Sequence, residues 1–402
     1  MRLRSLPGRA ARTFERELRK LRRIDEKVVR VPAAVDPPRG RAILSYIVDP
    51  FLLPPGAPVP HSHTHDWESL TMGRTLAALG FELDVVHWTN RTFEPRGDYD
   101  LLVDVRLLLE RLAPRLGPGC LKVMHAETAH PSFYNPAQRA RLDALAARRG
   151  IRLAPFKLLD DNRAIEHADA ATILGNEATQ ATYRFAGKPL YPVPISQPVL
   201  YPFPEEKDFA AARRRFLWFG SGGMVHKGLD LVLEAFSGMP ELELAVAGPV
   251  ERERDFERAF ARELYRTPNI RALGWVDVAG PAFTALAGRT LGLVYPSCSE
   301  GQNGGTVSCM HAALIPLVTR EVGVDVAPGC GVVLGEPTVE GIRAAVRALA
   351  ARPPAELARM ARSAWSHARE HHTRERFASV YRQRVLEIVG RFRPALRSRL
   401  LA

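Results

Sequence analysis

Short apolar runs alternate with stretches of helical periodicity along most of this chain. One such stretch, residues 67–80, ends at Gly80 between two apolar runs. Apolar runs of this length, separated by helices, are typical of parallel strands that are buried on both faces of a sheet. The pattern predicts strands over residues 42–48, 82–88, 101–105, 121–125 and 171–175, and a second helix over residues 136–149.

A proline-dense segment, residues 191–206, interrupts this alternation. Segments rich in proline act as extended spacers, so this one is the expected domain boundary. The alternation then restarts, with strands expected over residues 216–220, 241–248, 269–276, 291–295, 316–320 and 331–335, and helices over 229–239 and 251–266. Two rounds of the same pattern predict an α/β protein with two Rossmann-like, doubly wound domains that face a central cleft.

The length of 402 residues also favours two domains, because a single core rarely grows beyond about 300 residues. We expect four regions: a basic N-terminal helix and linker (1–40), an N-terminal domain (41–198), a C-terminal domain (199–375), and a basic C-terminal helix (376–402). The last helix is able to pack back on the N-terminal domain.

The net charge of +12 belongs to the two ends of the chain. Residues 1–30 hold eleven Lys and Arg against four Asp and Glu, residues 382–402 hold six Arg against one Glu, and the remainder is formally neutral. Apolar residues at helical spacing within residues 1–30 predict an amphipathic helix. Basic ends on a neutral body favour an anionic membrane surface as a partner, although an ordinary solvated charged face explains them equally well. Without a zinc-finger, RNP or interleaved aromatic pattern, nucleic acid is not an expected partner.

Other features of composition point to the cytoplasm. No apolar run is long enough for a transmembrane helix, and the N-terminus lacks the apolar core of a signal peptide. The four cysteines are widely spaced without a CxxC pair, which argues against a disulfide framework or a zinc site. We expect a cytoplasmic protein, with peripheral attachment to the inner face of the cell membrane as a further possibility.

Residues 295–318 combine an acid with a candidate anion site. Glu300 stands in a polar, glycine-rich loop between a strand and a helix that is expected to open at Thr306. The backbone N–H groups of Gly304, Gly305 and Thr306 would then lie at the helix N-terminus, which suits a phosphate. An acid beside such a site makes sense if the ligand has a phosphate end and a separate hydroxyl-rich end.

A second glycine-bearing loop, residues 219–228, follows the first strand of the C-terminal domain. Its glycines let the backbone approach a diphosphate, and Lys227 adds a positive charge. The spacing matches neither a P-loop nor a GxGxxG signature. The expected ligand-binding residues here are Gly220, Ser221, Gly222, Gly223 and Lys227.

Three motifs in this order resemble a known family. They are GSGGMVHKGLDLVLEAF, LGWV (273–276) and PSCSEGQNGGTVSCMHAALIPLVT. Together they resemble the glycosyltransferase family 4 (group 1) enzymes, which have the GT-B fold. The alternation of strands and helices resembles that of the family over residues 42–390. The specific motifs lie only in the C-terminal half of the chain.

The resemblance implies a donor site for a nucleoside-diphosphate sugar. Lys227 would neutralise the departing nucleoside diphosphate with help from the backbone of Gly304, Gly305 and Thr306, which agrees with the charge of such a leaving group. Glu300 would bind hydroxyls of the donor sugar, and Val276 would lie beside the base. His125, at a strand end where the family often has a histidine that contacts the donor sugar, is the third catalytic candidate, with a purely structural role as the alternative.

The chain departs from the family pattern at two places. The family usually carries a second glutamate eight residues after the first, and that position is Ser308 here, or Cys309 if the loop is one residue longer. The basic residue that often follows the first loop glycine is Ser221. Either the ribose is held differently, or donor binding is weakened or lost.

The histidine-rich segment 61–68 allows two interpretations. In an extended chain His61, His63 and His65 share one face and would chelate a metal. Alternatively, the segment leads into a helix from Trp67 with Asp66 as its N-cap, and lines the acceptor side of the cleft. No fourth ligand is evident, and GT-B enzymes as a group do not rely on a bound metal, so no metal or other cofactor is expected.

By resemblance, the expected activity is the transfer of a sugar from a nucleotide sugar to a hydroxyl of a glycan or lipid-linked acceptor, in the synthesis of glycans or cell-envelope polysaccharide and glycolipid. Retention of anomeric configuration is implied. A front-face mechanism is favoured, because no second carboxylate of the cleft stands out as a nucleophile. A nucleotide-sugar epimerase and a non-catalytic carbohydrate- or membrane-binding scaffold remain as alternatives.

Overall fold

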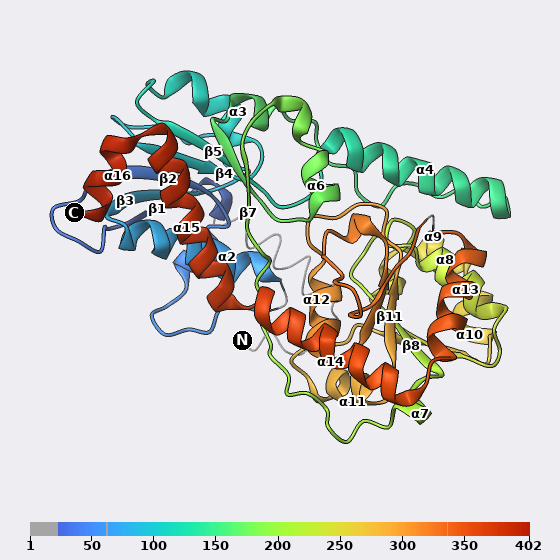
Figure 1. The fold of residues 1–402 in the computed structure, drawn as a ribbon. Coiled ribbons are helices and arrows are strands. Elements are labelled where there is room, and N and C mark those ends of the chain that lie inside the picture. The colour runs from blue at the N-terminus through green and yellow to red at the C-terminus, as the bar shows by residue number, and fades with distance from the viewer. Residues whose placement is uncertain (1–22, 62, 336) are drawn as a thin grey trace, which may run out of the picture.

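The protein consists of two α/β domains, each built on one sheet of mainly parallel strands (Figure 1). The computed structural model describes residues 23–61, 63–335 and 337–402. The predicted fold class is confirmed. The amphipathic helix predicted near the N-terminus lies largely outside the described residues.

The N-terminal sheet has seven strands in the order β1-β3-β2-β4-β5-β6-β7. All neighbours are parallel except β1 and β3. The strands are β1 (Val28–Val31), β2 (Gly40–Tyr46), β3 (Phe81–His87), β4 (Leu101–Asp104), β5 (Leu121–Ala126), β6 (Ala170–Ile173) and β7 (Leu190–Pro192).

Strand β1 corrects the prediction that residues 1–40 are only a helix and a linker. Val28–Val31 pairs antiparallel with β3, with Val29 opposite Val85. Three β-branched valines in four residues suit an edge strand, whereas the helical pattern before them stops at Ile24. The sheet of the N-terminal domain therefore begins before residue 41.

The C-terminal sheet has six parallel strands in the order β10-β9-β8-β11-β12-β13. This is the order of a Rossmann sheet, in which the chain builds outward from the centre in one direction and then in the other. The strands are β8 (Arg215–Phe219), β9 (Glu243–Ala247), β10 (Ile270–Gly274), β11 (Gly292–Tyr295), β12 (Ile315–Val318) and β13 (Val332–Val333).

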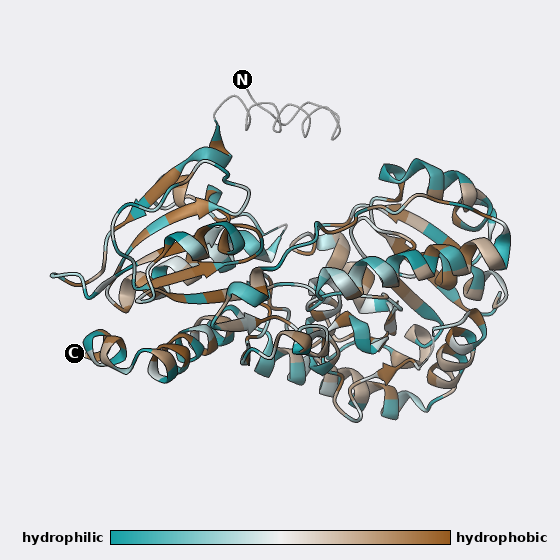
Figure 2. Ribbon diagram, turned by 90° about the horizontal axis from the view of Figure 1, so that it is seen from above, coloured by the Kyte–Doolittle hydropathy of each residue, from teal (hydrophilic) through white to brown (hydrophobic). Residues whose placement is uncertain are grey.

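Helices cover both sheets, so the strands are near-continuous apolar runs, brown in Figure 2. In the N-terminal domain they are α2 (Thr64–Ala78), α3 (Leu108–Leu112), α4 (Pro131–Arg149), α5 (Ala164–His167) and α6 (Glu177–Ala181). In the C-terminal domain they are α7 (Phe209–Ala212), α8 (Leu229–Ser237), α9 (Arg254–Ala259), α10 (Ala261–Arg266), α11 (Pro281–Arg289), α12 (Gly304–His311), α13 (Val339–Ala350) and α14 (Pro354–His371). Single 3₁₀ turns are η2 (Ile24–Glu26), η3 (Asp49–Leu52), η4 (Ala113–Arg115), η5 (Arg184–Ala186), η6 (Val250–Arg252) and η7 (Arg320–Val322).

The last two helices, α15 (Arg374–Phe392) and α16 (Pro394–Leu401), cross back to the N-terminal domain (Figure 1). Helix α15 packs on α2 and β6. Phe377, Tyr381 and Ile388 of α15 are buried in the same core as Leu44 and Val85. The core of the N-terminal domain therefore includes residues from the end of the chain.

Helix α4 of the N-terminal domain extends over the C-terminal domain (Figure 1). Near its end Arg148 Nη2 lies 2.8 Å from Asp230 Oδ2 of α8, and Arg149 Nη1 lies 2.8 Å from Glu263 Oε1 of α10. Earlier in the helix, Arg141 donates a hydrogen bond of 2.8 Å to the carbonyl oxygen of Pro296. These contacts hold the two domains together across one side of the cleft.

The loops at the carboxyl ends of the strands meet between the domains. In each sheet the strand order reverses once, between β8 and β11 in the C-terminal sheet and between β2 and β4 in the N-terminal sheet. Ligands of doubly wound sheets bind at such points. The glycine loop after β8, the Glu300 loop after β11, the histidine-rich segment after β2 and Arg106 after β4 all lie there.

No helix within the described parts of the chain is both long and apolar enough to span a bilayer. The four cysteines are buried free thiols.

Candidate functional site

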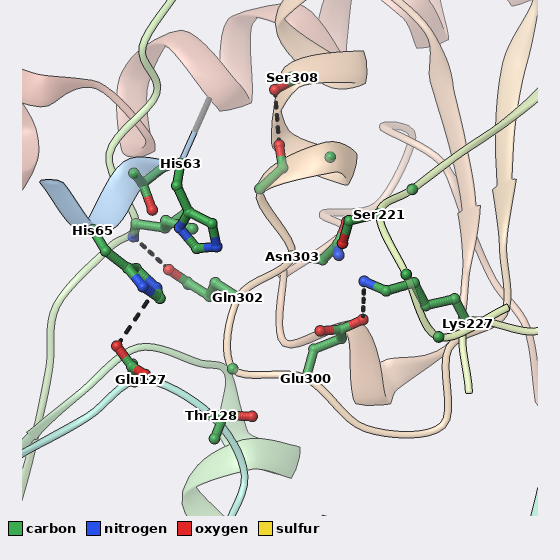
Figure 3. A pocket seen from close by; sticks show the side chains of 18 of the residues that line it. His63, His65, Glu127, Thr128, Ser221, Lys227, Glu300, Gln302, Asn303 and Ser308 are labelled. Atoms are coloured by element: carbon green, nitrogen blue, oxygen red, sulfur yellow. Dashed lines mark hydrogen bonds and ion pairs between the residues drawn. The ribbon is translucent and has the colours of Figure 1, made fainter. Parts of the chain in front are cut away.

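A cavity of about 400 Å³ lies between the two domains (Figure 3). Its walls come from both domains and from the segment that connects them. The N-terminal domain contributes residues 61, 63–65, 106, 127, 128, 134, 138, 156, 157 and 159; the connecting segment contributes 195, 197 and 198; the C-terminal domain contributes 219–223, 226, 227, 275–278, 300–305 and 308.

Lys227 and Glu300 meet in the wall of this cavity. Lys227 Nζ lies 3.3 Å from Glu300 Oε1 and donates a hydrogen bond of 2.8 Å to the hydroxyl of Tyr295. The same carboxylate oxygen accepts hydrogen bonds from Tyr295 at 3.1 Å and from Ser297 at 3.0 Å. The phosphate end and the sugar end expected from the sequence are therefore adjacent, and here the two side chains pair with each other.

Glu300 is ionised in this arrangement. Burial acts to raise its pKa, but the charge of Lys227 and the hydrogen bonds from Ser297 and Tyr295 outweigh burial and lower the pKa below 4.5. An ionised acceptor binds hydroxyl groups more strongly than a neutral one does. The carboxylate is thus prepared for a polyhydroxylated ligand.

The N-terminus of α12 supplies backbone donors beside this pair. Asn303 caps the helix. The helix begins at Gly304, two residues before Thr306, where the sequence predicted its start. Both the amide and the hydroxyl of Thr306 donate to Asn303 Oδ1, at 2.7 and 3.0 Å, so Thr306 has no donor left for a phosphate. Among the described residues nothing accepts from the amides of Gly304 and Gly305, and both glycines line the cavity.

The glycine loop after β8 also lines the cavity, through Gly220, Ser221, Gly222 and Gly223. The amide of Gly223 is already occupied, because it donates to the carboxylate of Glu253 together with the amide of Met224. Gly223 therefore shapes the loop and has no free amide for a phosphate. Only the neighbouring residues of the loop remain to offer backbone N–H groups.

Gly222 has a steric reason to be glycine. A Cβ at this position would lie 2.4 Å from Cζ of Phe156, a residue of the loop after α4. Phe156 thus packs directly on the glycine loop from the opposite domain. This contact covers one side of the cavity.

Val276 lines the other end of the cavity together with Trp275, whose side chain is half exposed. Next to them Asp277 Oδ1 lies 3.2 Å from Nε2 of His61 in the N-terminal domain. The contact between His61 and Asp277 thus joins the two domains beside Val276 and Trp275.

Ser308 and Cys309, the two candidates for the position of a second glutamate, differ in their surroundings. Ser308 lines the cavity, whereas Cys309 is fully buried in the core of the C-terminal domain. The hydroxyl of Ser308 lies 2.8 Å from the carbonyl oxygen of Gly304 (Figure 3) and 3.1 Å from Gln197 Oε1. Ser308 and Gln197 thus form an uncharged polar pair in the wall of the cavity.

The structure does not bring His125 to the cavity. Its ring is fully buried, Nδ1 lies 2.8 Å from Thr172 Oγ1, and the ring packs near Tyr46 and Tyr381. Burial lowers the pKa of His125 to about 4. The interpretation as a residue that contacts the donor sugar fails here because α15, which carries Tyr381, covers this face of the sheet.

The N-terminal wall of the cavity centres on Glu127 instead, the residue that follows β5. Arg106 donates to Glu127 Oε1, and His65 Nε2 lies 3.5 Å from Glu127 Oε2 (Figure 3). Burial acts to raise the pKa of Glu127, but the charge of Arg106 and its hydrogen bond to the carboxylate hold the pKa well below its usual range. Burial lowers the pKa of His65 to about 3, so its ring is neutral at pH 7.

The histidine-rich segment lines the cavity through His61, His63 and His65. This agrees with the interpretation of the segment as part of the cleft wall. Helix α2 begins at Thr64 with His63 as its N-cap, so Asp66 lies inside the first turn and does not cap the helix. Across the described ranges, no group of three or more His, Cys, Asp or Glu is placed to hold a metal ion.

A backbone clamp joins the Glu300 loop to the N-terminal domain. Thr179 Oγ1 donates to the carbonyl oxygens of Glu300 and Gly301, at 3.3 and 3.1 Å. Asn176 donates to the carbonyl oxygens of Arg320 and Gly323, both at 3.0 Å. Gly301 is so close to the other domain that a Cβ there would lie 2.1 Å from the carbonyl oxygen of Glu127.

The sequence pattern missed several residues of the cavity. Gln197 and Phe156 lie in irregular segments without a motif, and Arg106 and Lys157 look like ordinary surface cations. Gln302 lies within the motif that contains Glu300, but its residue type gave no reason to single it out. Glu127 follows His125 by two residues, near the end of a predicted strand that leads to the cleft. The one available signal for Arg106 and Glu127 was position, since each closely follows a predicted strand.

Comparisons with known proteins bear on the fold. No family model matches the chain, and no curated protein sequence matches it. Among solved structures, sucrose-phosphate synthase of Thermosynechococcus elongatus matches with a TM-score of 0.59 and 15% identity, over 86% of this chain and 99% of the other. The α,α-trehalose 6-phosphate synthase of Burkholderia multivorans gives a TM-score of 0.58 and 12% identity, over 89% and 97%.

Anabaena HepE, solved in complex with UDP and glucose, gives a TM-score of 0.52 and 12% identity, over 87% of this chain and all of the other. At such identities the likeness concerns the fold, and it extends over nearly the full length of these three proteins. These neighbours have the GT-B fold. The chain therefore has the GT-B fold.

Proposed function

We propose that this protein is a glycosyltransferase that moves a sugar from a nucleoside-diphosphate donor to an acceptor hydroxyl. The observation that carries the proposal is the group formed by Lys227, Glu300 and the amides of Gly304 and Gly305 in the wall of the interdomain cavity. It offers a cation and backbone donors next to an ionised carboxylate. A sugar diphosphate needs both kinds of partner at adjacent positions.

Each group has a distinct task in the reaction. Negative charge develops on the departing diphosphate, and Lys227 with the two amides is positioned to stabilise that charge. Glu300 accepts from hydroxyls of the sugar and orients its anomeric carbon. When the donor binds, Lys227 exchanges the carboxylate of Glu300 for a phosphate oxygen, which frees the carboxylate for the sugar.

The nucleoside would occupy the end of the cavity near Val276 and Trp275. Gln197 and Ser308 are placed to bind the ribose hydroxyls, in the role of the missing glutamate. Because neither carries a charge, we expect weaker recognition of ribose than a carboxylate would give. No metal ion is needed in this scheme, since Lys227 and the helix N-terminus supply the positive potential.

Retention of configuration is part of the proposal. Oε1 of Glu300 accepts hydrogen bonds from Lys227, Tyr295 and Ser297, and a carboxylate held in this way suits hydroxyl binding better than attack on the anomeric carbon. In a front-face reaction the leaving phosphate accepts the proton of the attacking hydroxyl. The configuration of the product, read by NMR, tests this point, and an inverted product would rule it out.

The experiment that tests the function is a screen of UDP- and GDP-sugars by calorimetry and by slow hydrolysis of the donor. We expect one donor to bind and to be hydrolysed, and Glu300→Gln to reduce hydrolysis by about 10²-fold. Glu340→Gln, at an exposed position on α13, serves as the matched control and should behave as wild type. If no nucleotide sugar binds, the proposal fails.

A nucleotide-sugar epimerase is the second candidate, and one observation favours it. Glu127 and Glu300 line the cavity from opposite domains, as a two-sided acid and base would. Product analysis without any acceptor separates the two functions. An epimerase returns a nucleotide sugar of changed configuration, whereas a transferase releases the free sugar.

Peripheral membrane binding, with a cell-envelope glycan or lipid-linked acceptor and a cytoplasmic location, completes the proposal. Part of the basic C-terminus is engaged within the chain, since Arg399 Nη2 lies 2.7 Å from Asp100 and Arg393 donates to the carbonyl oxygen of Pro118. Arg384 is likewise paired with Glu387, at 2.7 Å. We propose that basic residues of the C-terminus without such partners, together with those of residues 1–22, contact anionic lipid. Salt-sensitive sedimentation with anionic liposomes tests this, and binding that survives deletion of residues 1–22 would contradict a role for that segment.

A further inference from the structure

A second cavity of about 250 Å³ adjoins the interdomain cavity and is lined entirely by the N-terminal domain. The two cavities share the residues Arg106, Glu127, Thr128, Lys157 and Leu159. The shared residues form the junction between them. We call the second cavity the side chamber.

Polarity changes along the side chamber. Four of the five residues at the junction are polar or charged. Away from the junction the lining is mainly apolar, with Asp160 and Asn162 as the polar members. The apolar lining residues there are Trp88, Val105, Leu107, Met124, Pro131, Leu158 and Tyr183. A ligand that fits this lining has an apolar end in the chamber and a polar end at the junction.

The carboxylate of Glu127 has an unfilled hydrogen-bonding position at the junction. Its Oε2 is buried and accepts no hydrogen bond of ordinary geometry within the described parts of the chain, although His65 Nε2 lies 3.5 Å away. A buried acceptor without a hydrogen bond is costly, and a hydroxyl group of a ligand would supply one. Nearby, the ammonium group of Lys157 has no hydrogen-bond or ion-pair partner among the described residues.

Arg106 keeps the wall of the chamber in place. Its guanidinium group lies 4.8 Å from the ring centroid of Trp88 and donates to Glu127 Oε1. This stacking fixes the orientation of Trp88, whose ring contributes to the apolar lining. The same arginine holds the carboxylate of Glu127 toward the junction.

We propose that the side chamber is the binding site for an apolar group of the acceptor, and that the acceptor is an amphiphilic alcohol such as an aryl or alkyl glycoside. Its apolar group lies between Trp88, Met124 and Leu158, and its reacting hydroxyl reaches the junction at Glu127. This assignment deepens the proposed function and rests on it, because the ligand is an acceptor only if the protein is a transferase. A simple unsubstituted sugar would leave the apolar lining unfilled and bind more weakly.

The volume and the lining set the size of the apolar group. Burial of apolar surface stabilises binding by about 25 cal/mol per Å², so a ring or a short chain that fills the chamber gains affinity over a free sugar. Only the N-terminal domain lines the chamber. Its ligand therefore needs no nucleotide to be recognised, and the binding of the two substrates is separable.

Direct binding of an aryl glycoside tests the proposal. Calorimetry with nitrophenyl glucoside should detect binding to the full chain, with affinity about tenfold higher than for glucose. Leu158→Asp places a charge in the apolar lining and should lower the affinity about tenfold. Leu158 is 38% exposed and lies in a loop, so the substitution is tolerable for folding.

Leu52→Asp is the matched control, because Leu52 is 37% exposed and lines neither cavity. We expect this variant to bind nitrophenyl glucoside as wild type does. The proposal is overturned if wild type does not bind the aryl glycoside better than glucose. It is equally overturned if Leu158→Asp binds like wild type, or if Leu52→Asp loses as much affinity.

A parallel titration with UDP and GDP separates this result from the proposed function. Aryl glycoside binding without any nucleotide binding would refute the transferase and leave the chamber assigned to an apolar ligand. Nucleotide binding without preference for the aryl glycoside would refute the chamber assignment alone.

Discussion

The two walls of the cleft recognise their ligands by different means. The wall of the C-terminal domain offers backbone amides and one close pair of charges, all on two loops that follow neighbouring strands. The wall of the N-terminal domain is built from side chains of His63, His65, Arg106, Glu127 and Lys157, which come from four separate segments. The first wall has a recognisable sequence, and the second does not.

The reason for this difference is geometric. A backbone site needs glycines and a helix N-terminus in consecutive positions, so its requirements appear as a local motif. A side-chain site needs only that the right groups meet in space, and its residues are free to lie anywhere in the chain. In the proposed function the wall of the C-terminal domain binds the donor and that of the N-terminal domain binds the acceptor, so we call them the donor wall and the acceptor wall.

Loss of the cation should have the largest effect, and it should be confined to the donor wall. Lys227→Met keeps most of the length of the side chain and removes its charge. We expect turnover of the nucleotide sugar to fall by about 10²- to 10³-fold, because the leaving diphosphate loses its charge partner. Steady-state hydrolysis of the donor measures this, while unchanged affinity for nitrophenyl glucoside would show that the two walls act independently.

A smaller and complementary effect is expected at the acceptor wall. Glu127→Gln keeps the shape of the side chain and a hydrogen-bond acceptor for Arg106. Transfer to an acceptor should fall by about 10- to 100-fold, through loss of a charged acceptor for the hydroxyl. Affinity for the nucleotide, measured by calorimetry, should stay within about twofold of wild type; a loss as large as that of Lys227→Met would abolish the distinction between the walls.

A substitution in the backbone clamp should lower activity by less than the two changes above, but more than a change at Glu68. Gly301→Ala introduces a Cβ that would lie 2.1 Å from the carbonyl oxygen of Glu127, so the Glu300 loop and the N-terminal domain must move apart. We expect kcat/KM for the donor to fall about tenfold, since a small displacement of Glu300 weakens its hold on the sugar.

Gly288→Ala provides the control for this change. A Cβ at Gly288 would meet no atom within 4 Å, and the residue lies in α11 away from the cleft. Its turnover should equal that of wild type. If Gly301→Ala is equally active, the close approach of the two loops has no role in the site.

The least effect on turnover is expected at Glu68 of α2, which accepts two hydrogen bonds of 2.9 Å from Ser196 in the connecting segment. Burial raises the pKa of Glu68 from 4.5 to about 7. Between these values the folded protein keeps a proton that the unfolded chain has released, so stability falls as the pH rises from 4.5 to 7.

Glu68→Gln removes this titration and keeps the acceptor for Ser196. Thermal unfolding should show that the variant gains stability relative to wild type at pH 8 and not at pH 4.5, by about 1–3 kcal/mol. Equal differences at the two pH values would contradict the raised pKa. Turnover of the donor at pH 8 should be unaffected.

Most of the fold could be predicted from the sequence, because buried parallel strands leave continuous apolar runs. Strand β1 could not, since four residues at a sheet edge carry too little pattern to be separated from a linker. In the donor wall the motif located Lys227 and Glu300 but did not show that they pair. The burial of His125 depends on Tyr381, more than 250 positions later, and no local pattern contains that relation.

The return of α15 to the first domain has a consequence for synthesis of the chain. Translation delivers residues in order, at about 5–20 per second, and domains tend to fold as their sequence becomes complete. The C-terminal domain is one continuous segment and has all of its parts before α15 is made. The N-terminal core must wait for Phe377, Tyr381 and Ile388, so the half that is synthesised first is the half that is finished last.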